Sequence, residues 1–487
     1  MTTGRVMAAM TLLSALGAAL LLARYGHYPS LSDSWSYRFF AFRFRLDGVM
    51  HDFGTVRTYG YPLFLWALTP FSGFSFSRLA AVAGGVQWAL HAAASLLLAR
   101  GLRPLGPAVV LGTLAGLLLA PLGLALVTDA LTEGLTLPLA VALAALAVRL
   151  AGPYAAWRTE SVLLAGAGLA AYALMLRPGN LPVTVGWHLG ILAAIALAPH
   201  WRAMRARMLA AALAAFVLAG LVVWGPQLAY ALREVGTATI LPACNLGAFQ
   251  FGIGVLLWKY DTIVTAAGGT PWFTVNPLFE GTLPVDEALA WYTRYPLQGA
   301  ATLLAHVVLP LGPRSPFVYI YDLDAPYGLS LRALQAAIAV FGAWRLLDHL
   351  RRARGTAWRS WTAALVLVAT SCLGTIAITA LSAPETRFLA LPMTVLAALA
   401  AEGAWAAARR EARIGRMRLA ASLAGAAGLV VLFSMSDRLG RADYAPAALR
   451  MPDRPTGCHF TLEGRGGGDA AAIARFEERM RAVGGSP

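Results

Sequence analysis

The feature that most constrains this chain is a series of eleven apolar segments, each long enough or nearly long enough to cross a membrane. A membrane-spanning helix needs about 20 mostly apolar residues, and backbone in hydrocarbon must satisfy its own hydrogen bonds, which favours helices. Of the 487 residues, 58% are hydrophobic and only 13% are charged, and the mean hydropathy is +0.63. The pattern predicts an all-α polytopic membrane protein and excludes a water-soluble enzyme, a disordered chain and a disulfide-stapled scaffold. The segments are 6–24, 79–99, 108–126, 130–148, 161–177, 181–199, 208–226, 329–347, 360–381, 386–404 and 419–435.

The formal net charge of +15 is distributed unevenly along the chain. If the N-terminus is cytoplasmic, Arg5 and five loops on that side carry 18 arginines and four acidic residues, a net charge of +14. The rest of the chain carries 21 basic and 20 acidic residues, a net charge of +1. Cytoplasmic loops of membrane proteins are rich in basic residues, so we predict this orientation and expect no nucleic-acid partner. The arginine, alanine and glycine content favours a bacterial source, and hence the inner (cytoplasmic) membrane. The five loops lie near 100–107, 149–160, 200–207, 345–359 and 402–418.

This orientation divides the chain into a transmembrane domain, 1–435, and a polar extracytoplasmic tail, 436–487. Two extracytoplasmic loops of the membrane domain are long. The first, 25–78, is rich in aromatic residues and arginine and includes an amphipathic stretch, which predicts interfacial helices. The second, 227–328, contains Pro296–Pro313, whose apolar core is too short to span and predicts a helix on the outer face.

The first long loop places Asp33 just beyond the end of the first span. A carboxylate near a low-dielectric boundary can have a raised pKa and act as a base toward a hydroxyl. A helix N-cap is the alternative interpretation, since Ser32 or Asp33 would cap a helix that begins there.

Further charges gather at the same predicted membrane face. Asp129 and Glu133 have the four-residue spacing that places two carboxylates on one helical face, although water in a short loop could also solvate them. Arg177 ends one span and Arg387 opens another. Arginine suits bidentate phosphate binding, but single arginines at helix ends also extend toward lipid headgroups. The joint occurrence of these residues favours a site.

In their order and spacing, these stretches resemble the bacterial multi-span glycosyltransferases of the GT-C superfamily, near the protein O-mannosyltransferase and aminoarabinose transferase branch. The resemblance covers about residues 1–405. It rests on Ser32-Asp33-Ser34 with Tyr37, Arg57-Thr58-Tyr59-Gly60-Tyr61-Pro62-Leu63-Phe64-Leu65, Leu131-Thr132-Glu133-Gly134-Leu135, Leu176-Arg177-Pro178 and Glu385-Thr386-Arg387-Phe388-Leu389.

The resemblance implies that Asp33 is the catalytic base and that a second acid assists it. Glu133 matches the family's Thr-Glu pattern better than Asp129 does. Two departures leave the donor sugar open: no second acid directly follows Asp33, and Gly60 stands where the family often has proline. The residues implied to hold the donor phosphate are Arg57, Tyr59, Tyr61 and Arg387, and Arg177 completes a phosphate clamp on chemical grounds.

The implied reaction moves a sugar from a polyprenyl-phosphate donor to an acceptor hydroxyl on the extracytoplasmic side, in contact with membrane lipids. Direct attack on the anomeric carbon inverts its configuration. The acceptor, whether lipid, glycan or protein, stays open. No cofactor is required, and the histidines lack metal-site spacing, although His51-Asp52 with Asp33 leaves a divalent cation possible.

Two other classes of function also fit a polytopic chain: a lipid or solute transporter or flippase, and a non-catalytic cell-envelope assembly protein. Transporters tend to place charges near the membrane midplane, often in repeated halves. Here the candidate charges lie at the outer mouths and no repeat is visible. A polymerase or ligase that uses a diphosphate-linked donor is a third alternative, but such enzymes usually centre their chemistry on a large late loop.

The three cysteines permit one further prediction. Cys372 falls within the ninth apolar segment. Cys244 and Cys458 both fall on the predicted outer, oxidising side, where a disulfide between them would tie the tail to the second long loop.

Overall fold

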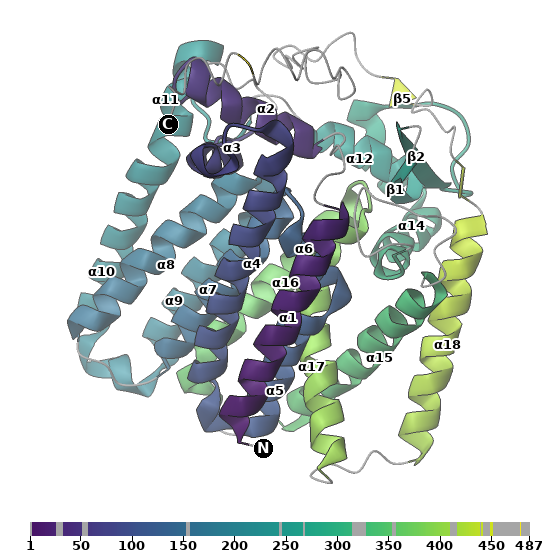
Figure 1. The fold of residues 1–487 in the computed structure, drawn as a ribbon. Coiled ribbons are helices and arrows are strands. Elements are labelled where there is room, and N and C mark those ends of the chain that lie inside the picture. Colours follow the sequence, from purple (N-terminus) through teal and green to yellow (C-terminus); the bar gives the residue numbers. More distant parts are fainter. Residues whose placement is uncertain are drawn as a thin grey trace.

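Long helices stand side by side in a bundle, and short helices with small β-sheets cover one end of it (Figure 1). The N-terminus lies at the opposite end, together with the helix ends that the five arginine-rich loops join (Figure 1). The uneven charge of the sequence is thus a difference between the two ends of the bundle. This computed structural model describes residues 2–25, 33–50, 57–151, 156–242, 246–265, 268–313, 328–352, 357–409, 416–438, 440–441, 449–450 and 478.

Nine helices among the described residues are long and apolar enough to cross a membrane. A bent pair, α5 (Pro107–Leu119) and α6 (Pro121–Thr128), makes a tenth candidate with an angle of 52°. The bend has a local cause, because Pro121 disfavours a helical conformation at Ala120, which is extended. The predicted multi-pass all-α membrane protein is confirmed. The nine correspond to α1 (Thr3–Tyr25), α4 (Phe76–Gly101), α7 (Thr132–Arg149), α8 (Ala156–Leu176), α9 (Leu181–Leu197), α10 (Arg205–Ala219), α16 (Thr362–Leu381), α17 (Ala390–Ala408) and α18 (Arg416–Arg438). The candidate with α9 is Pro178–Leu197, and the candidate with α10 is the longer helical segment Pro199–Val235.

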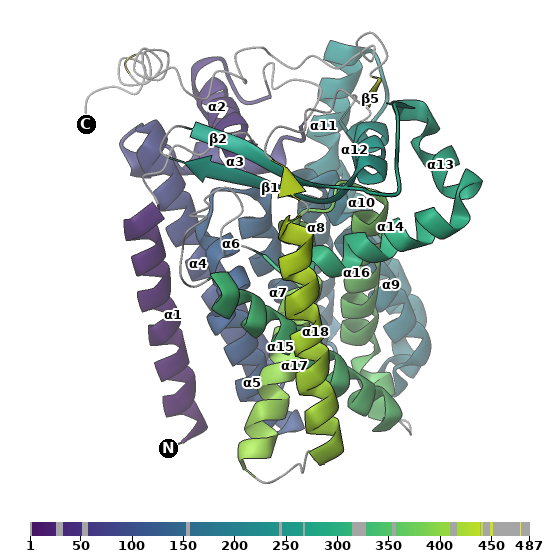
Figure 2. The same cartoon turned by 90° about the vertical axis from the view of Figure 1, so that its right-hand side faces the viewer.

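The remaining predicted segment, 329–347, is also helical, as α15 (Gly328–Arg352), but is not one of these ten candidates. Arg332, Gln335 and Arg345 lower its mean hydropathy. It packs against α17 and α18, and its place beside α18 is clear in Figure 2. Ten of the eleven predicted segments therefore coincide with span candidates, and a membrane crossing by α15 stays a prediction.

The first long loop contains α2 (Asp33–Leu46) and α3 (Gly60–Leu68), which lie across the covered end of the bundle (Figure 1). The helices predicted in this loop are confirmed. Aromatic rings attach α2 to the bundle, since Trp35 and Phe42 lie 5.9 Å and 5.5 Å from the ring of Phe76 in α4.

The second long loop contains α12 (Leu246–Leu256), α13 (Ala288–Arg294) and the short apolar helix α14 (Pro296–Val308). It begins later than predicted, because α11 (Gly225–Tyr230) continues the span candidate Pro199–Val235. It also forms an antiparallel hairpin of β1 (Leu257–Thr265) and β2 (Gly268–Val275), which the sequence analysis did not predict. Two short strands of the tail pair with this loop: β4 (Gly440–Arg441) with β2, and β5 (Leu449–Arg450) with β3 (Leu283–Pro284). The tail and the loop are thus joined through main-chain pairing, whereas Cys244 and Cys458 lie outside the described residues.

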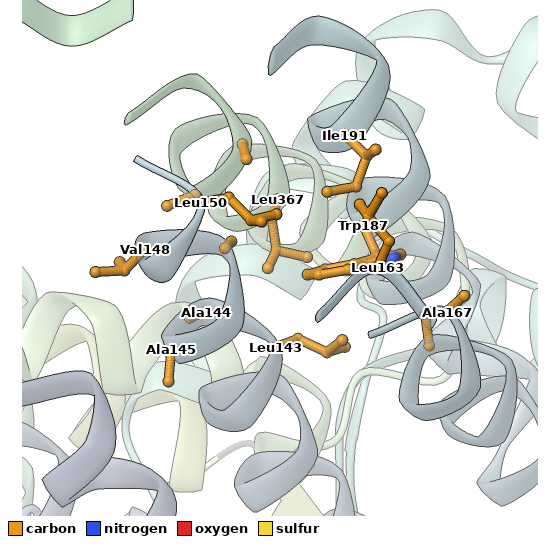
Figure 3. Packing of buried hydrophobic residues seen from close by; sticks show 14 of the residues in the cluster. Leu143, Ala144, Ala145, Val148, Leu150, Leu163, Ala167, Trp187, Ile191 and Leu367 are labelled. Atoms are coloured by element: carbon orange, nitrogen blue, oxygen red, sulfur yellow. The ribbon is translucent and has the colours of Figure 1, made fainter. Parts of the chain in front are cut away.

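Small residues let the helices of the bundle approach closely. Figure 3 shows the largest buried cluster, in which Trp187 of α9 packs among side chains of α7, α8 and α16. A Cβ atom on Gly166 of α8 would lie 1.9 Å from the Trp187 ring. Glycine is therefore required for this contact, which is typical of membrane helix packing, where small residues admit close neighbours.

Candidate functional site

Asp33 begins α2 at the covered end of the bundle, and both of its carboxylate oxygens contact arginines. Oδ1 pairs with Nη2 of Arg57, and Oδ2 accepts a hydrogen bond from Nη2 of Arg387 at 2.9 Å. Arg57 in turn donates from Nη1 to the Tyr37 hydroxyl at 3.1 Å, and its guanidinium lies 4.8 Å from the centre of that ring. Asp33 is thus held between the two arginines that the sequence predicted to bind phosphate.

Arg387 joins this pair to further carboxylates. It lies in the 3₁₀ turn η10 (Thr386–Leu389), and its Nη2 also donates to Glu385 Oε1 at 3.1 Å. Its Nε lies 2.6 Å from Glu385 Oε2 and 3.7 Å from Glu133 Oε1. Glu133 is in the first turn of α7 and pairs with Arg177. The six charged residues form one acid–arginine cluster: Asp33, Glu133, Glu385, Arg57, Arg177 and Arg387.

The cluster has a partly exposed part, here called the open edge, and a buried part. The side chains of Asp33, Arg57 and Arg177 are 21%, 23% and 28% exposed, whereas those of Glu133, Glu385 and Arg387 are at most 9% exposed. Its three acids and three arginines cancel in formal charge. An anion that enters at the open edge therefore competes with these carboxylates for the arginines.

The two arginines determine the ionisation of Asp33. Burial favours the neutral acid, but the guanidinium groups of Arg57 and Arg387 outweigh it and hold the pKa of Asp33 well below its ordinary value. The carboxylate is therefore ionised. With both oxygens paired it is a weak proton acceptor.

Asp129 has the opposite electrostatic environment. It caps the C-terminus of α6, and burial, assisted by Glu133, raises its pKa to about 6, although Arg387 opposes the shift. Its backbone carbonyl accepts a hydrogen bond from Gln87 Nε2 at 2.7 Å. The two acids predicted beside the base thus differ, since Glu133 is part of the acid–arginine cluster and Asp129 titrates near neutral pH.

Tyr59 and Tyr61 lie at the start of α3, with their hydroxyls bonded to protein groups. Tyr59 donates to the Val223 carbonyl at 2.6 Å, and Tyr61 donates to Gln87 Oε1 at 2.8 Å. Both side chains are buried. In this arrangement they support α3 and the chain that carries Arg57, and their predicted contact with phosphate stays a prediction.

Gly60 permits the closest approach in this region. A Cβ atom at Gly60 would lie 2.4 Å from the carbonyl oxygen of Met175, near the end of α8. The Gly60 carbonyl accepts a hydrogen bond from the Tyr172 hydroxyl at 2.8 Å. Because Arg57 precedes α3 and Arg177 follows α8, this contact helps to fix the distance between the two arginines.

Two residues of the site received no role from the sequence. Tyr37 lies one helical turn after Asp33, and Glu385 lies two residues before Arg387; both belong to the short motifs quoted above. Their short sequence distances from Asp33 and Arg387 were the only features that could have indicated a role in the site. Among the described residues, no group of three His, Cys, Asp or Glu side chains could hold a metal ion, and His51 and Asp52 lie outside the described part of the chain.

These observations define a multi-pass membrane protein with an acid–arginine cluster at one end of its bundle. No protein-family model matches the chain, and no curated protein matches it. Among solved structures, an archaeal oligosaccharyltransferase, AglB from Archaeoglobus fulgidus in complex with an inhibitory peptide and a dolichol-phosphate, is similar with 13% sequence identity and a TM-score of 0.45. The match covers 90% of this chain and 56% of the archaeal chain, so this chain spans little more than half the length of that protein.

Proposed function

We propose that this protein is a membrane glycosyltransferase that moves a sugar from a polyprenyl-phosphate donor to an acceptor hydroxyl on the extracytoplasmic side. One observation carries the proposal: Asp33, a candidate base at the open edge of the cluster, pairs with two cations, the partly exposed Arg57 and the buried Arg387. A base and a cationic phosphate site within reach of each other are what this transfer requires.

In the proposed step, one bond forms at the anomeric carbon and one bond to it breaks. The acceptor oxygen forms a bond to the anomeric carbon, and its proton passes to Asp33. The bond from that carbon to the phosphate oxygen breaks, and polyprenyl phosphate leaves with the bonding pair. Arg57, Arg177 and Arg387 stabilise the charge that develops on the phosphate. Attack from the face opposite the leaving group inverts the configuration.

Donor binding also activates the base in this scheme. Asp33 is too strongly paired to accept a proton while it binds both arginines. Phosphate oxygens that bind Arg57 and Arg387 replace the carboxylate, which raises the pKa of Asp33 toward its ordinary value. Glu133 keeps Arg177 in place, and Asp129 is the second acid that can exchange a proton near neutral pH.

The proposed topology follows from the charges of the two ends of the bundle. The arginine-rich end that includes the N-terminus faces the cytoplasm of a bacterium, and the cluster faces the outside with the tail 436–487. Residues 1–435 form the membrane domain in which lipid tails of donor and bilayer are accommodated. The acceptor is a hydroxyl of a lipid, a glycan or a protein.

The test uses native-host membranes that lack the chromosomal copy of the protein and contain either the wild type or Asp33→Asn. Labelled polyprenyl-phosphate mannose and polyprenyl-phosphate aminoarabinose are supplied, and release of polyprenyl phosphate is measured. We expect Asp33→Asn to lower release by about 100-fold or more, the range of general base catalysis. Asp47→Asn is the matched control, since Asp47 lies just after α2 and, within the described part of the chain, pairs with Arg43 of the same helix. Equal release by the two variants would contradict the assignment of the base.

A further inference from the structure

Glu385 contacts Arg387 through both oxygens. Oε1 accepts a hydrogen bond from Nη2 at 3.1 Å, and Oε2 lies 2.6 Å from Nε. The two residues are 7% and 6% exposed. A buried guanidinium is costly without a counter-charge. The contact at Nη2 has hydrogen-bond geometry and the contact at Nε is an ion contact without it, and together they restrict the orientation of the guanidinium.

The turn that carries Glu385 is held on several sides. Pro384 restricts the backbone before it, and the Glu385 amide donates to the Ala383 carbonyl at 3.1 Å. The Phe388 amide donates to the Glu385 carbonyl at 3.1 Å. Helix α12 of the second long loop packs against the start of this turn, since a Cβ on Gly254 would lie 2.9 Å from the Leu381 carbonyl oxygen. The backbone of Glu385 is thus fixed independently of the cluster.

The other two acids on Arg387 have different attachments. Asp33 comes from α2 and also pairs with Arg57, and Glu133 comes from α7 and also pairs with Arg177. Asp33 is thus divided between two arginines, whereas Glu385, among the described residues, pairs with Arg387 alone.

We infer that Glu385 is a positioning residue that holds the Arg387 guanidinium toward the donor phosphate and stays paired with it when the phosphate replaces Asp33. The inference rests on the proposed function. It assigns the three acids of the cluster unequal roles: Asp33 exchanges partners, Glu133 supports Arg177, and Glu385 orients the shared arginine.

The experiment measures binding of undecaprenyl phosphate to the purified, detergent-solubilised full chain, with undecaprenol as the ligand that has the same tail and no phosphate. We expect Glu385→Gln to weaken binding of undecaprenyl phosphate by about 10-fold, or about 1.4 kcal/mol, and to leave undecaprenol binding unchanged. Glu385→Asp keeps the charge and restores part of the loss. Glu402→Gln is the matched control, because Glu402 is an equally buried acid that pairs with Arg345 in the opposite half of the bundle.

Two results overturn the inference. Unchanged affinity in Glu385→Gln would show that Arg387 needs no orientation, and tighter binding would show that Glu385 only competes with the phosphate. If Glu385→Gln does not fold, as melting curves would show, Glu385→Asp decides, with affinity equal to that of the wild type as the contradicting result. Asp33→Asn separates this inference from the proposed function, because it should retain binding and lose transfer.

Discussion

Nη2 of Arg387 lies between two carboxylates, 2.9 Å from Asp33 Oδ2 and 3.1 Å from Glu385 Oε1, although Asp33 is 354 residues away in sequence. The first long loop and the turn after α16 therefore meet at one guanidinium. This relationship makes the two parts of the site depend on each other.

Replacement of this guanidinium tests that dependence. Arg387→Lys keeps the positive charge but loses the planar donor geometry that serves two carboxylates at once. We expect transfer to fall by about 100-fold or more, as on loss of an aligned donor to developing charge. Arg345→Lys is the control, since Arg345 pairs with Glu402 outside the cluster. Transfer above half of the wild-type rate in Arg387→Lys would contradict the proposed role, and initial rates in membranes supply the measurement.

The raised pKa of Asp129 predicts a pH-dependent stability. Its pKa is about 6 in the folded chain and 3.8 as an ordinary acid, so the folded chain retains a proton that the unfolded chain loses between these values. The resulting stabilisation is present below pH 3.8 and is lost as the pH rises through about 6. Asp129→Asn does not titrate at this position. The melting temperature of the variant minus that of the wild type should therefore be a few degrees more positive at pH 7.5 than at pH 4.5. A constant difference at the two pH values would be the contrary result.

The contact between Gly60 and α8 predicts a sharp difference between two glycine substitutions. Gly60→Ala places a Cβ against the Met175 carbonyl oxygen and should cost about 2 kcal/mol, as overpacking does. It should also lower transfer, because Arg57 lies just before α3 and Arg177 directly follows α8. Gly85→Ala is the control, since a Cβ atom at Gly85 would meet nothing within 4 Å. Thermal melting and transfer are measured for both, and equal melting temperatures would show that α3 can move without cost.

Removal of the Tyr59 hydroxyl is expected to lower stability without weakening donor binding. This hydroxyl donates to the Val223 carbonyl, so Tyr59→Phe should lower the free energy of unfolding by about 1 kcal/mol and leave undecaprenyl phosphate binding within about 2-fold, a difference below 0.5 kcal/mol. Tyr37→Phe removes the hydroxyl that Arg57 contacts and should weaken that binding. Weaker binding in Tyr59→Phe, with Tyr37→Phe unaffected, would favour the role that the family resemblance implies for Tyr59.

The helices were predictable because the bilayer imposes length and hydropathy on each span. Ten predicted segments coincide with span candidates, and α15 differs because its polar residues lower its hydropathy. The β1–β2 hairpin was not predictable in the same way, because a strand that does not cross a membrane needs no apolar stretch of about 20 residues. Its pairing with the tail joins segments far apart in sequence.

The charged residues of the site were visible in the sequence, but their partners were not. Asp33, Glu133, Arg57, Arg177 and Arg387 were singled out by position, and the structure brings them together. Glu385 was missed as a participant because its role depends on the geometry of one turn. The hydroxyls of Tyr59 and Tyr61 point to groups of other helices, which no local pattern reveals.

The pairing of β4 with β2 and of β5 with β3 has a consequence for biogenesis. The second long loop emerges from the ribosome well before the strands that complete its sheets, which follow the last span α18. Strands β2 and β3 therefore each have an unpaired edge until β4 and β5 have been synthesised. The sheets at the covered end of the bundle are completed only after the strands of the tail have been made, and a chain released before then would expose these edges to other proteins.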